Sequence, residues 1–191
     1  MTTGTSRRQP ATDDEARFAE IYRRHARSIQ AYCARRTAAS QVSDAVADTF
    51  LVAWRRIDQV PIGAATLPWL YGVAYKVLSH QWRHRARNRR LVERLHSLAQ
   101  VEEMAPDILL VRSEEHRVVL AASARLKPVD QEILRLTLWE ELSHADVAVV
   151  LGIEPTAVKQ RAYRARRNLA DEYRKLTGDR KPPAARKGGG L

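Results

Sequence analysis

The segment from Ser143 to Arg161 has the pattern of a helix-turn-helix, and it constrains the fold more than any other part of the chain. Ser143 and Asp146 are typical of a helix N-cap and its first turn. Gly152 suits the left-handed residue that ends a helix, and Pro155 suits the first turn of the next one. Ala148 is small where two helices would cross closely. The side chains expected to point inward are Val147, Leu151, Ile153 and Val158.

The second helix of this pair would expose a polar and basic face. Arg and Lys side chains suit guanine bases and phosphates, and Gln suits adenine, so this face favours DNA binding. The alternative is a helical hairpin in another α-domain, whose basic face is merely solvated. The candidate DNA-binding residues are Pro155, Thr156, Lys159, Gln160, Arg161, Arg164 and Arg166.

The charge balance also points to a polyanionic partner. The 191 residues include 33 Lys and Arg against 22 Asp and Glu, a net charge of +11. No apolar run is long enough to cross a bilayer, so we expect nucleic acid rather than a membrane. The N-terminus lacks the apolar core of a signal peptide, and a single cysteine, Cys33, forms no internal disulfide. These features predict a cytoplasmic protein in which Cys33, on an apolar stripe, is a buried hydrophobe.

Apolar periodicity predicts helices along the whole chain, arranged in two groups. In the first group, one helix runs from about Asp14 to Arg36, a second is capped by Ser43, and a third begins near Pro68. The buried stripe of the second helix is expected to be Val46, Phe50, Trp54 and Ile57. The second group begins near Arg112, and Pro128 starts the helix that leads into the helix-turn-helix.

We therefore predict an all-α fold of two small helical bundles joined by a flexible linker. The bundles span residues 13–97 and 113–176, and the acidic segment 98–112 between them has the composition of a linker. Residues 1–12 and the basic tail 177–191 are expected to be disordered because they are polar or rich in Pro and Gly.

The third helix is preceded by a loop with Pro and Gly and carries aromatic residues beside positive charge. Aromatic faces next to cations can capture unstacked bases of a single strand. The alternative is that these aromatics are core, which we expect of Trp82 and leave open for Trp69 and Tyr75. The loop covers residues 58–67, and the aromatics of the helix are Trp69, Tyr71, Tyr75 and Trp82.

Little in the sequence supports an enzymatic function. His80 and His84 could share a helix face, but no catalytic Glu or cysteine cluster accompanies them. The chain has no Gly-rich phosphate loop and no clear set of nucleophile, base and orienting acid. We therefore expect no enzyme activity, no metal and no cofactor.

Three segments, in this order, resemble the extracytoplasmic-function (ECF) sigma factors of bacteria: Ser43 to Trp54, Trp69 to Ala74, and Trp139 to Arg166. The resemblance extends from residue 14 to about residue 175. It implies that residues 13–97 are sigma region 2 and residues 113–176 sigma region 4. It also implies a factor that binds core RNA polymerase through its largest subunits, reads the −35 and −10 promoter elements and stabilises melted −10 DNA. An anti-sigma factor is a common partner in the family, although this sequence carries no motif for one.

The resemblance assigns roles to residues of the first bundle. The second helix would dock on the clamp coiled coil of the polymerase, the loop 58–68 would hold a base turned out of the non-template strand, and the third helix would approach that strand. The family often has Gln at the position of Ala47, Arg at that of Val52 and Asn at that of Lys76. The implied core polymerase-binding residues are Asp44, Asp48, Leu51, Val52 and Arg55, and the implied −10 DNA-binding residues are Trp69, Tyr75, Lys76, His80 and Arg83.

Two other functions remain open at this point. A helix-turn-helix regulator that forms no holoenzyme would carry a ligand or dimerisation domain in place of the first bundle. An RNA-binding or ribosome-associated helical protein fits the charge but leaves the turn around Gly152 as a coincidence.

Overall fold

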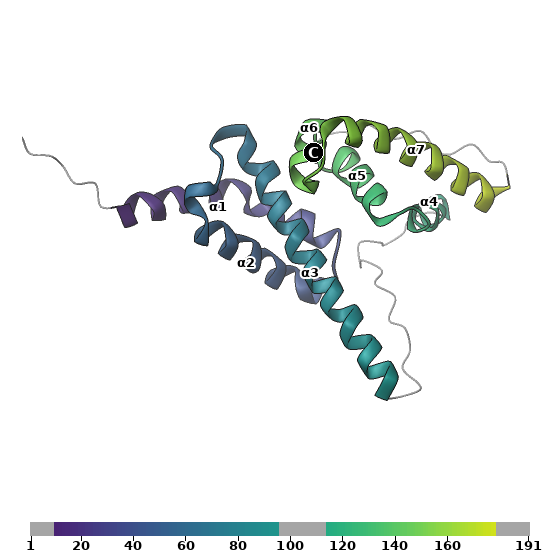
Figure 1. Cartoon of the computed structure of the whole chain (residues 1–191), viewed down its shortest axis with the longest axis horizontal. Coiled ribbons are helices and arrows are strands. Elements are labelled where there is room, and N and C mark those ends of the chain that lie inside the picture. Colours follow the sequence, from purple (N-terminus) through teal and green to yellow (C-terminus); the bar gives the residue numbers. More distant parts are fainter. Residues whose placement is uncertain (1–9, 96–113, 179–191) are drawn as a thin grey trace, which may run out of the picture. The chain divides into compact units, whose positions relative to one another are not determined.

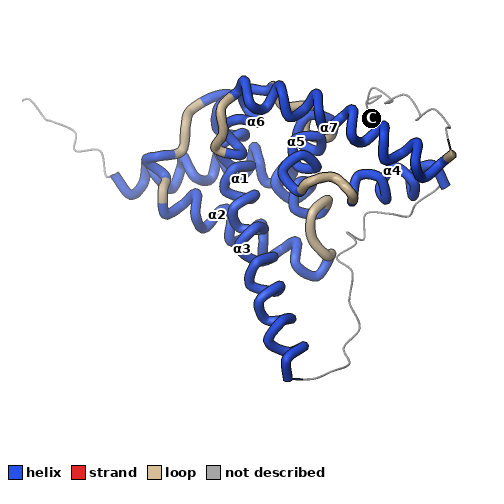
Figure 2. The backbone as a smooth tube through the Cα atoms, turned by 45° about the vertical axis from the view of Figure 1, so that its right-hand side comes forward, coloured by secondary structure: helices blue, strands red, loops and turns tan. Residues whose placement is uncertain are grey.

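The computed structural model describes residues 10–95 and 114–178, which form helices joined by short turns, with no strand in these two ranges. The all-α prediction is confirmed. The chain divides into two compact units, Met1–Ile108 and Leu109–Leu191. Figures 1 and 2 show the helices of each unit. The predicted linker and tail lie almost entirely outside the described residues.

The N-terminal unit is a bundle of three helices, each packed against the other two. They are α1 (Pro10–Ala34), α2 (Ala39–Arg55) and α3 (Thr66–Leu95). Burial of large apolar side chains at their contacts stabilises the unit. The C-terminal half of α3 extends beyond the other two helices in both views (Figures 1 and 2). The fully buried large side chains of the bundle include Ile29, Tyr32, Leu70 and Leu78.

Two expectations for α2 are wrong. The helix begins at Ala39 with Ala38 as its N-cap, so Ser43 lies inside the helix rather than at its start. Trp54 was expected in the buried stripe but is 40% exposed. The reason is that the helix turns the small side chains of Ala45, Thr49 and Ala53 inward beside Phe50, which is buried as expected.

The C-terminal unit contains α4 (Glu114–Ala124), α5 (Pro128–Leu138), α6 (His144–Leu151) and α7 (Pro155–Thr177), and α7 packs against the other three. The turn between α6 and α7 follows the sequence prediction. The Ser143 hydroxyl accepts the Asp146 N–H at 3.1 Å, and Gly152 has a left-handed φ of 65°. Val147 and Val158 are fully buried, whereas Leu151 and Ile153 are only partly buried.

Cys33 lies in the core of the N-terminal unit, as the sequence predicted. Burial raises the pKa of its thiol to about 11, although the nearby Arg36 opposes the shift. Because the thiolate is the reactive form, native Cys33 should resist thiol reagents. We predict negligible reaction with an aromatic disulfide at pH 8 and one equivalent per chain in denaturant, measured by absorbance. Rapid modification of the native protein would contradict this burial.

The turn after α5 places Glu141 at a left-handed φ of 53°, a conformation that costs a non-glycine residue free energy. We predict that Glu141→Gly raises the free energy of unfolding of the C-terminal unit by about 1 kcal/mol, measured by calorimetry. Gly152→Ala is the matched control. Its new Cβ would meet no atom within 4 Å at φ +65°, so it should destabilise through backbone strain alone. A loss of stability in Glu141→Gly would show that the glutamate side chain matters more than the backbone.

Candidate nucleic-acid and protein-binding surfaces

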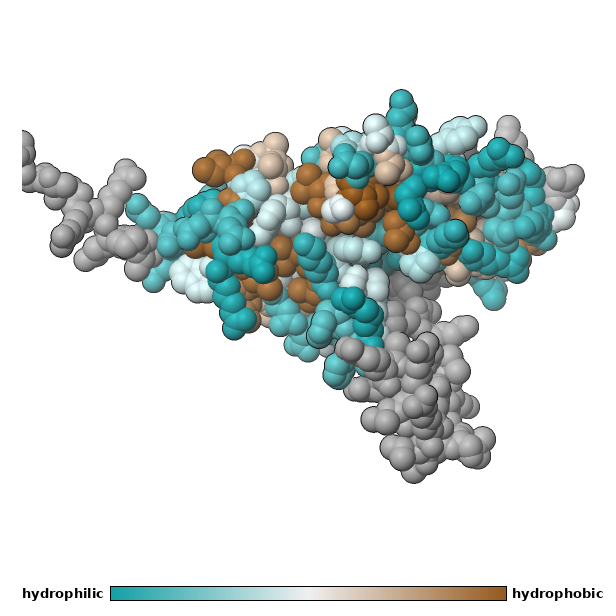
Figure 3. Space-filling model, in the orientation of Figure 1, coloured by the Kyte–Doolittle hydropathy of each residue, from teal (hydrophilic) through white to brown (hydrophobic). Residues whose placement is uncertain are grey.

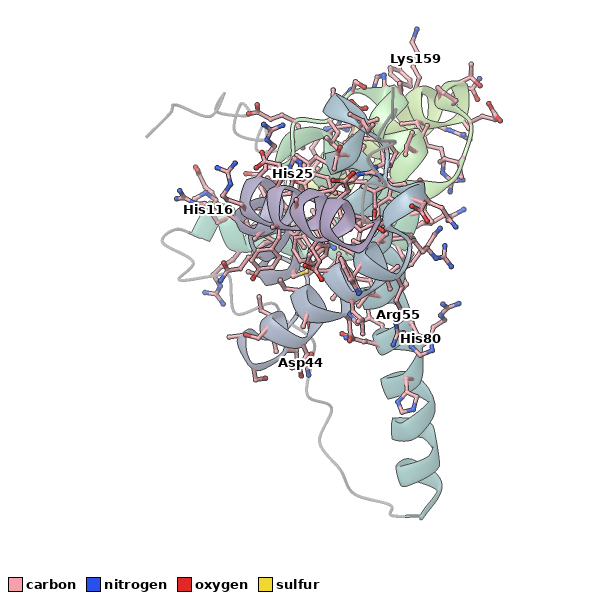
Figure 4. The ribbon with its side chains drawn as sticks, turned by 90° about the vertical axis from the view of Figure 1, so that its left-hand side faces the viewer. His25, Asp44, Arg55, His80, His116 and Lys159 are labelled. Carbon is pink, nitrogen blue, oxygen red and sulfur yellow. The ribbon has the colours of Figure 1, made fainter. Side chains whose placement is uncertain are left out.

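The outer face of α2 combines apolar and charged side chains. Leu51 and Trp54 are 44% and 40% exposed, and Val52 is partly buried. Asp44, Asp48 and Arg55 are exposed around them (Figure 4 labels Asp44 and Arg55). An apolar centre with charges at its rim is typical of a protein-binding surface. We call Asp44, Asp48, Leu51, Val52, Trp54 and Arg55 the α2 face.

Aromatic rings from α1 support the α2 face from behind. The Phe18 ring meets the Trp54 ring edge-on at 5.2 Å, and the Tyr22 ring meets that of Phe50 at 4.7 Å. Phe50 is buried, as expected, but Trp54 and Tyr22 are exposed on one side. Such ring pairs stabilise a contact beyond the area that they bury. They hold Trp54 in place while leaving part of its ring available.

The loop between α2 and α3 is anchored at several points. It contains two short 3-10 turns, Ile57–Gln59 and Gly63–Ala65. Ile57 and Val60 are buried, and the Arg17 guanidinium from α1 donates a hydrogen bond to the Val60 carbonyl. The Thr66 hydroxyl donates to the Pro61 carbonyl at 2.7 Å. The loop is therefore an ordered element beside the start of α3.

The surface of α3 carries a cationic stripe. Trp69, Lys76, His80 and Arg83 follow one another at spacings of seven, four and three residues, which places them along one side of a helix. Lys76, His80 and Arg83 are exposed, and Trp69 and Tyr75 are partly buried. Figure 4 shows His80 projecting from α3. We call Trp69, Lys76, His80 and Arg83 the α3 stripe.

The other aromatics of α3 turn inward to different degrees. Tyr71 is 5% exposed, and its ring lies 5.0 Å from that of Tyr32. Trp82, expected in the core, is only partly buried, and its buried Nε1 finds no hydrogen-bond partner among the described residues. Trp69 and Tyr75 are partly buried, as Trp82 is, so each keeps some exposed surface.

The second helix of the helix-turn-helix, α7, presents an open hollow. The side chains that line it are Thr156, Lys159, Gln160, Tyr163 and Arg164. Lys159 extends away from the helix in Figure 4, and Pro155 and Arg166 are also exposed. The sequence analysis missed Tyr163, which is 68% exposed. Its spacing of four and three residues from Lys159 and Gln160 was the signal that could have identified it.

Arg161 is placed differently from its neighbours on α7. Its Nε lies 3.1 Å from the Asp130 Oδ1 of α5, and the two side chains are 37% and 13% exposed. This ion pair ties α7 to α5, so the guanidinium faces the fold. Arg161 is not among the residues that line the α7 hollow.

In the described ranges, no group of three or more His, Cys, Asp and Glu is positioned to hold a metal ion. None of the helices described there has the length and apolar character that a membrane span requires. Figure 3 shows one face of the molecule, on which hydrophobic side chains gather in several groups among hydrophilic ones.

Known proteins are similar to this chain in sequence and in fold. Residues 116–169 match the family model described as "Sigma-70, region 4". The chain is 30% identical over 164 residues to the ECF RNA polymerase sigma factor SigL of Mycobacterium tuberculosis, covering 83% of this chain and 90% of SigL. The chain belongs to the ECF RNA polymerase sigma factors.

Other sigma factors agree with this assignment. NccH of Alcaligenes xylosoxydans xylosoxydans, an RNA polymerase sigma factor, is 29% identical and covers 85% of this chain and 89% of its own length. The sigma factor RpoE of Bartonella quintana, solved with the anti-sigma factor NepR, has a TM-score of 0.64 at 22% identity. That comparison covers 85% of this chain and 98% of RpoE, and it shows a shared fold.

As an RNA polymerase sigma factor, this protein binds core polymerase and directs transcription initiation at specific promoters by reading their −35 and −10 elements. The relatives give no support to a regulator that forms no holoenzyme. The matched region 4 contains the helix-turn-helix, which is consistent with the order of segments on which the resemblance was based.

The placement of Arg161 separates it from the other cations of α7. We predict that Lys159→Ala and Arg164→Ala each reduce the salt dependence of promoter binding by the holoenzyme, by roughly one unit of slope. Arg161→Ala should leave the slope unchanged and lower stability instead. The coupling to Asp130, measured by a double-mutant cycle in urea, should be about 0.5 kcal/mol because the pair is partly exposed. If Arg161→Ala instead reduces the slope of the salt dependence and shows no coupling energy with Asp130, Arg161 contacts DNA.

Proposed function

We propose that the two units of this sigma factor have separate binding roles. The N-terminal unit binds core polymerase and the melted −10 strand, and the C-terminal unit reads the −35 duplex. The observation that carries this proposal is that each unit presents its own exposed cationic helix surface, the α3 stripe in one and the α7 hollow in the other. The former lies beside an anchored loop, and the latter belongs to a helix-turn-helix.

The α2 face suits the polymerase contact. Leu51 and Trp54 offer apolar area that is already held in position, so little side-chain freedom is lost on binding. The rim charges Asp44, Asp48 and Arg55 would set the register against complementary charges on the polymerase. Val52, partly buried, would contribute to the apolar centre.

The α3 stripe suits a single strand better than a duplex. Lys76, His80 and Arg83 can follow the phosphates, while Trp69 and Tyr75 offer aromatic surface to unstacked bases. Removing a base from the stack costs a few kcal/mol, and binding only the extruded base shifts the equilibrium toward melted DNA. Melting therefore needs binding alone, and we assign no catalytic residue and no cofactor.

The α7 hollow suits the major groove of the −35 element. Lys159 and Arg164 can approach guanine or phosphate, and Gln160 can pair with adenine. Pro155 and Thr156 at the helix start lie where a recognition helix approaches the DNA, and Arg166 extends the basic surface. Tyr163 would supply an apolar contact between the polar ones, whereas Arg161 would support the helix from behind.

An anti-sigma factor is a further partner that we infer. RpoE of Bartonella quintana was solved with NepR, and CnrH with the cytosolic domain of CnrY. In the free protein the α2 face leaves Leu51 and Trp54 in water, and a regulatory partner that covered them would also block polymerase.

The test starts from a promoter selected out of random templates by core polymerase plus this protein. We predict that Leu51→Asp lowers core affinity by at least about tenfold, because it places a charge in the apolar centre. Lys76→Ala should weaken holoenzyme binding to a pre-melted −10 template, and Lys159→Ala binding to the −35 duplex, each by several-fold, with core affinity unchanged. Binding assays by fluorescence anisotropy measure all three.

Matched controls lie outside these surfaces. Arg23→Ala on α1 and Arg174→Ala at the end of α7 remove exposed cations that belong to neither DNA surface. Both should transcribe like the parent in a run-off assay. If these controls lose as much affinity for DNA as Lys76→Ala and Lys159→Ala, net charge rather than the named surfaces drives binding. If Leu51→Asp binds core polymerase with the affinity of the parent, the α2 face is not the polymerase-binding surface.

A further inference from the structure

Gln81 is a polar side chain at a position of α3 that its spacing assigns to the interior of the bundle. The buried side of α3 runs through Leu70, Ala74 and Leu78, and Gln81 follows Leu78 by three residues on the same side of the helix. Gln81 is itself partly buried. Apolar periodicity alone would favour a hydrophobic residue at such a position.

The Gln81 amide is hydrogen-bonded through only one of its two polar atoms. Its Nε2 donates a hydrogen bond to Oδ2 of Asp48, on α2, at 3.3 Å. Its Oε1 is buried and finds no hydrogen-bond partner among the described residues. A buried acceptor without a partner lowers the stability of a fold, and a single exposed hydrogen bond offsets only part of that loss. Packing therefore does not account for a glutamine at this position.

The group that the amide holds is the carboxylate of Asp48. Asp48 is exposed on the α2 face, and α2 and α3 lie side by side in both views (Figures 1 and 2). An exposed aspartate without support samples several rotamers, and fixing one of them on binding costs entropy. The hydrogen bond from Gln81 fixes the carboxylate before a partner arrives. Because this bond is made to Oδ2, the other oxygen, Oδ1, can accept a hydrogen bond from a cation.

We propose that Gln81 is a positioning residue of the polymerase-binding surface. It holds Asp48 in the orientation in which the α2 face accepts a basic side chain of core polymerase, a charge-assisted hydrogen bond that depends on geometry. The inference rests on the proposed polymerase contact of the α2 face. It adds a residue of α3 that acts through Asp48, and it explains why a polar side chain occupies the buried side of that helix.

The test uses the full-length protein and measures stability and binding separately. Gln81→Met keeps the length and the helix propensity of the side chain but removes both the donor and the unpartnered acceptor. We expect its melting temperature to rise by about 3 °C, measured by calorimetry. Its affinity for core polymerase, measured by fluorescence anisotropy, should fall about fivefold. Gln30→Met, the same change at an exposed position of α1, is the matched control and should leave core affinity unchanged.

Two further variants isolate the contact with Asp48. Gln81→Glu would place a second carboxylate against that of Asp48, so it should lower core affinity more than Gln81→Met does. In an Asp48→Ala background, Gln81→Met should cause no further loss of core affinity, because no carboxylate remains to be positioned. Additive losses in the double variant, or core affinity equal to the parent in Gln81→Glu, would overturn the inference.

The remaining outcomes separate the inference from the proposed function. If Asp48→Ala and Leu51→Asp both bind core polymerase like the parent, the α2 face itself is rejected. If both lose affinity but Gln81→Met does not, only the positioning role of Gln81 is rejected.

Two results would assign Gln81 a different role and so overturn the proposal. A fall in both the melting temperature and the core affinity of Gln81→Met would make Gln81 a packing residue. At saturating core polymerase, Gln81→Met should bind the pre-melted −10 template like the parent, because the α3 stripe is unchanged. Weaker binding to that template would make Gln81 part of the DNA-binding surface.

Discussion

Close helix packing on buried alanines is the constraint on which both units depend. Ala45, Ala53 and Ala74 in the N-terminal unit, and Ala162 and Ala165 in the C-terminal unit, have no exposed surface. Where only a methyl group separates two helices, their backbones approach closely and long side chains must lie elsewhere. The buried stripe of α7 runs through Val158, Ala162 and Ala165, so the hollow with Lys159, Gln160 and Tyr163 lies on the exposed side of the helix. The candidate binding surface therefore lies on the side of α7 that faces away from the alanine stripe.

Sequence reasoning succeeded where the signals are local. The turn of the helix-turn-helix could be predicted from a capping hydroxyl at Ser143, a left-handed glycine at Gly152 and a proline at the start of α7. Cys33 was assigned correctly because its stripe on α1 is regular. The sequence also yielded the cationic residues of α3, since charges there can lie only on the side away from the core.

The error on α2 arises because small residues and a large one compete for the inside of the bundle. On α2 the apolar spacing favoured Trp54 as core, but Ala45, Thr49 and Ala53 pack inward and turn the indole toward the surface. Arg161 follows Val158 by three residues and precedes Ala165 by four, so it borders the buried stripe and meets Asp130. Periodicity in a single helix could not reveal that partner, because Asp130 comes from α5. The Arg17 anchor of the loop could not be predicted for the same reason, since Arg17 comes from α1 and its partner Val60 lies 43 residues away.

Exposed apolar side chains occur beside charges in each candidate site: Leu51 and Trp54 on α2, Ile62 before α3, and Tyr163 on α7. Two of them are supported locally: the Phe18 ring lies against Trp54, and the Thr66 hydrogen bond anchors the loop that carries Ile62. Single exposed apolar side chains are common on protein surfaces, so exposure alone does not mark a binding site. Where a support holds the side chain in place, less entropy is lost on binding, and this is what distinguishes Trp54.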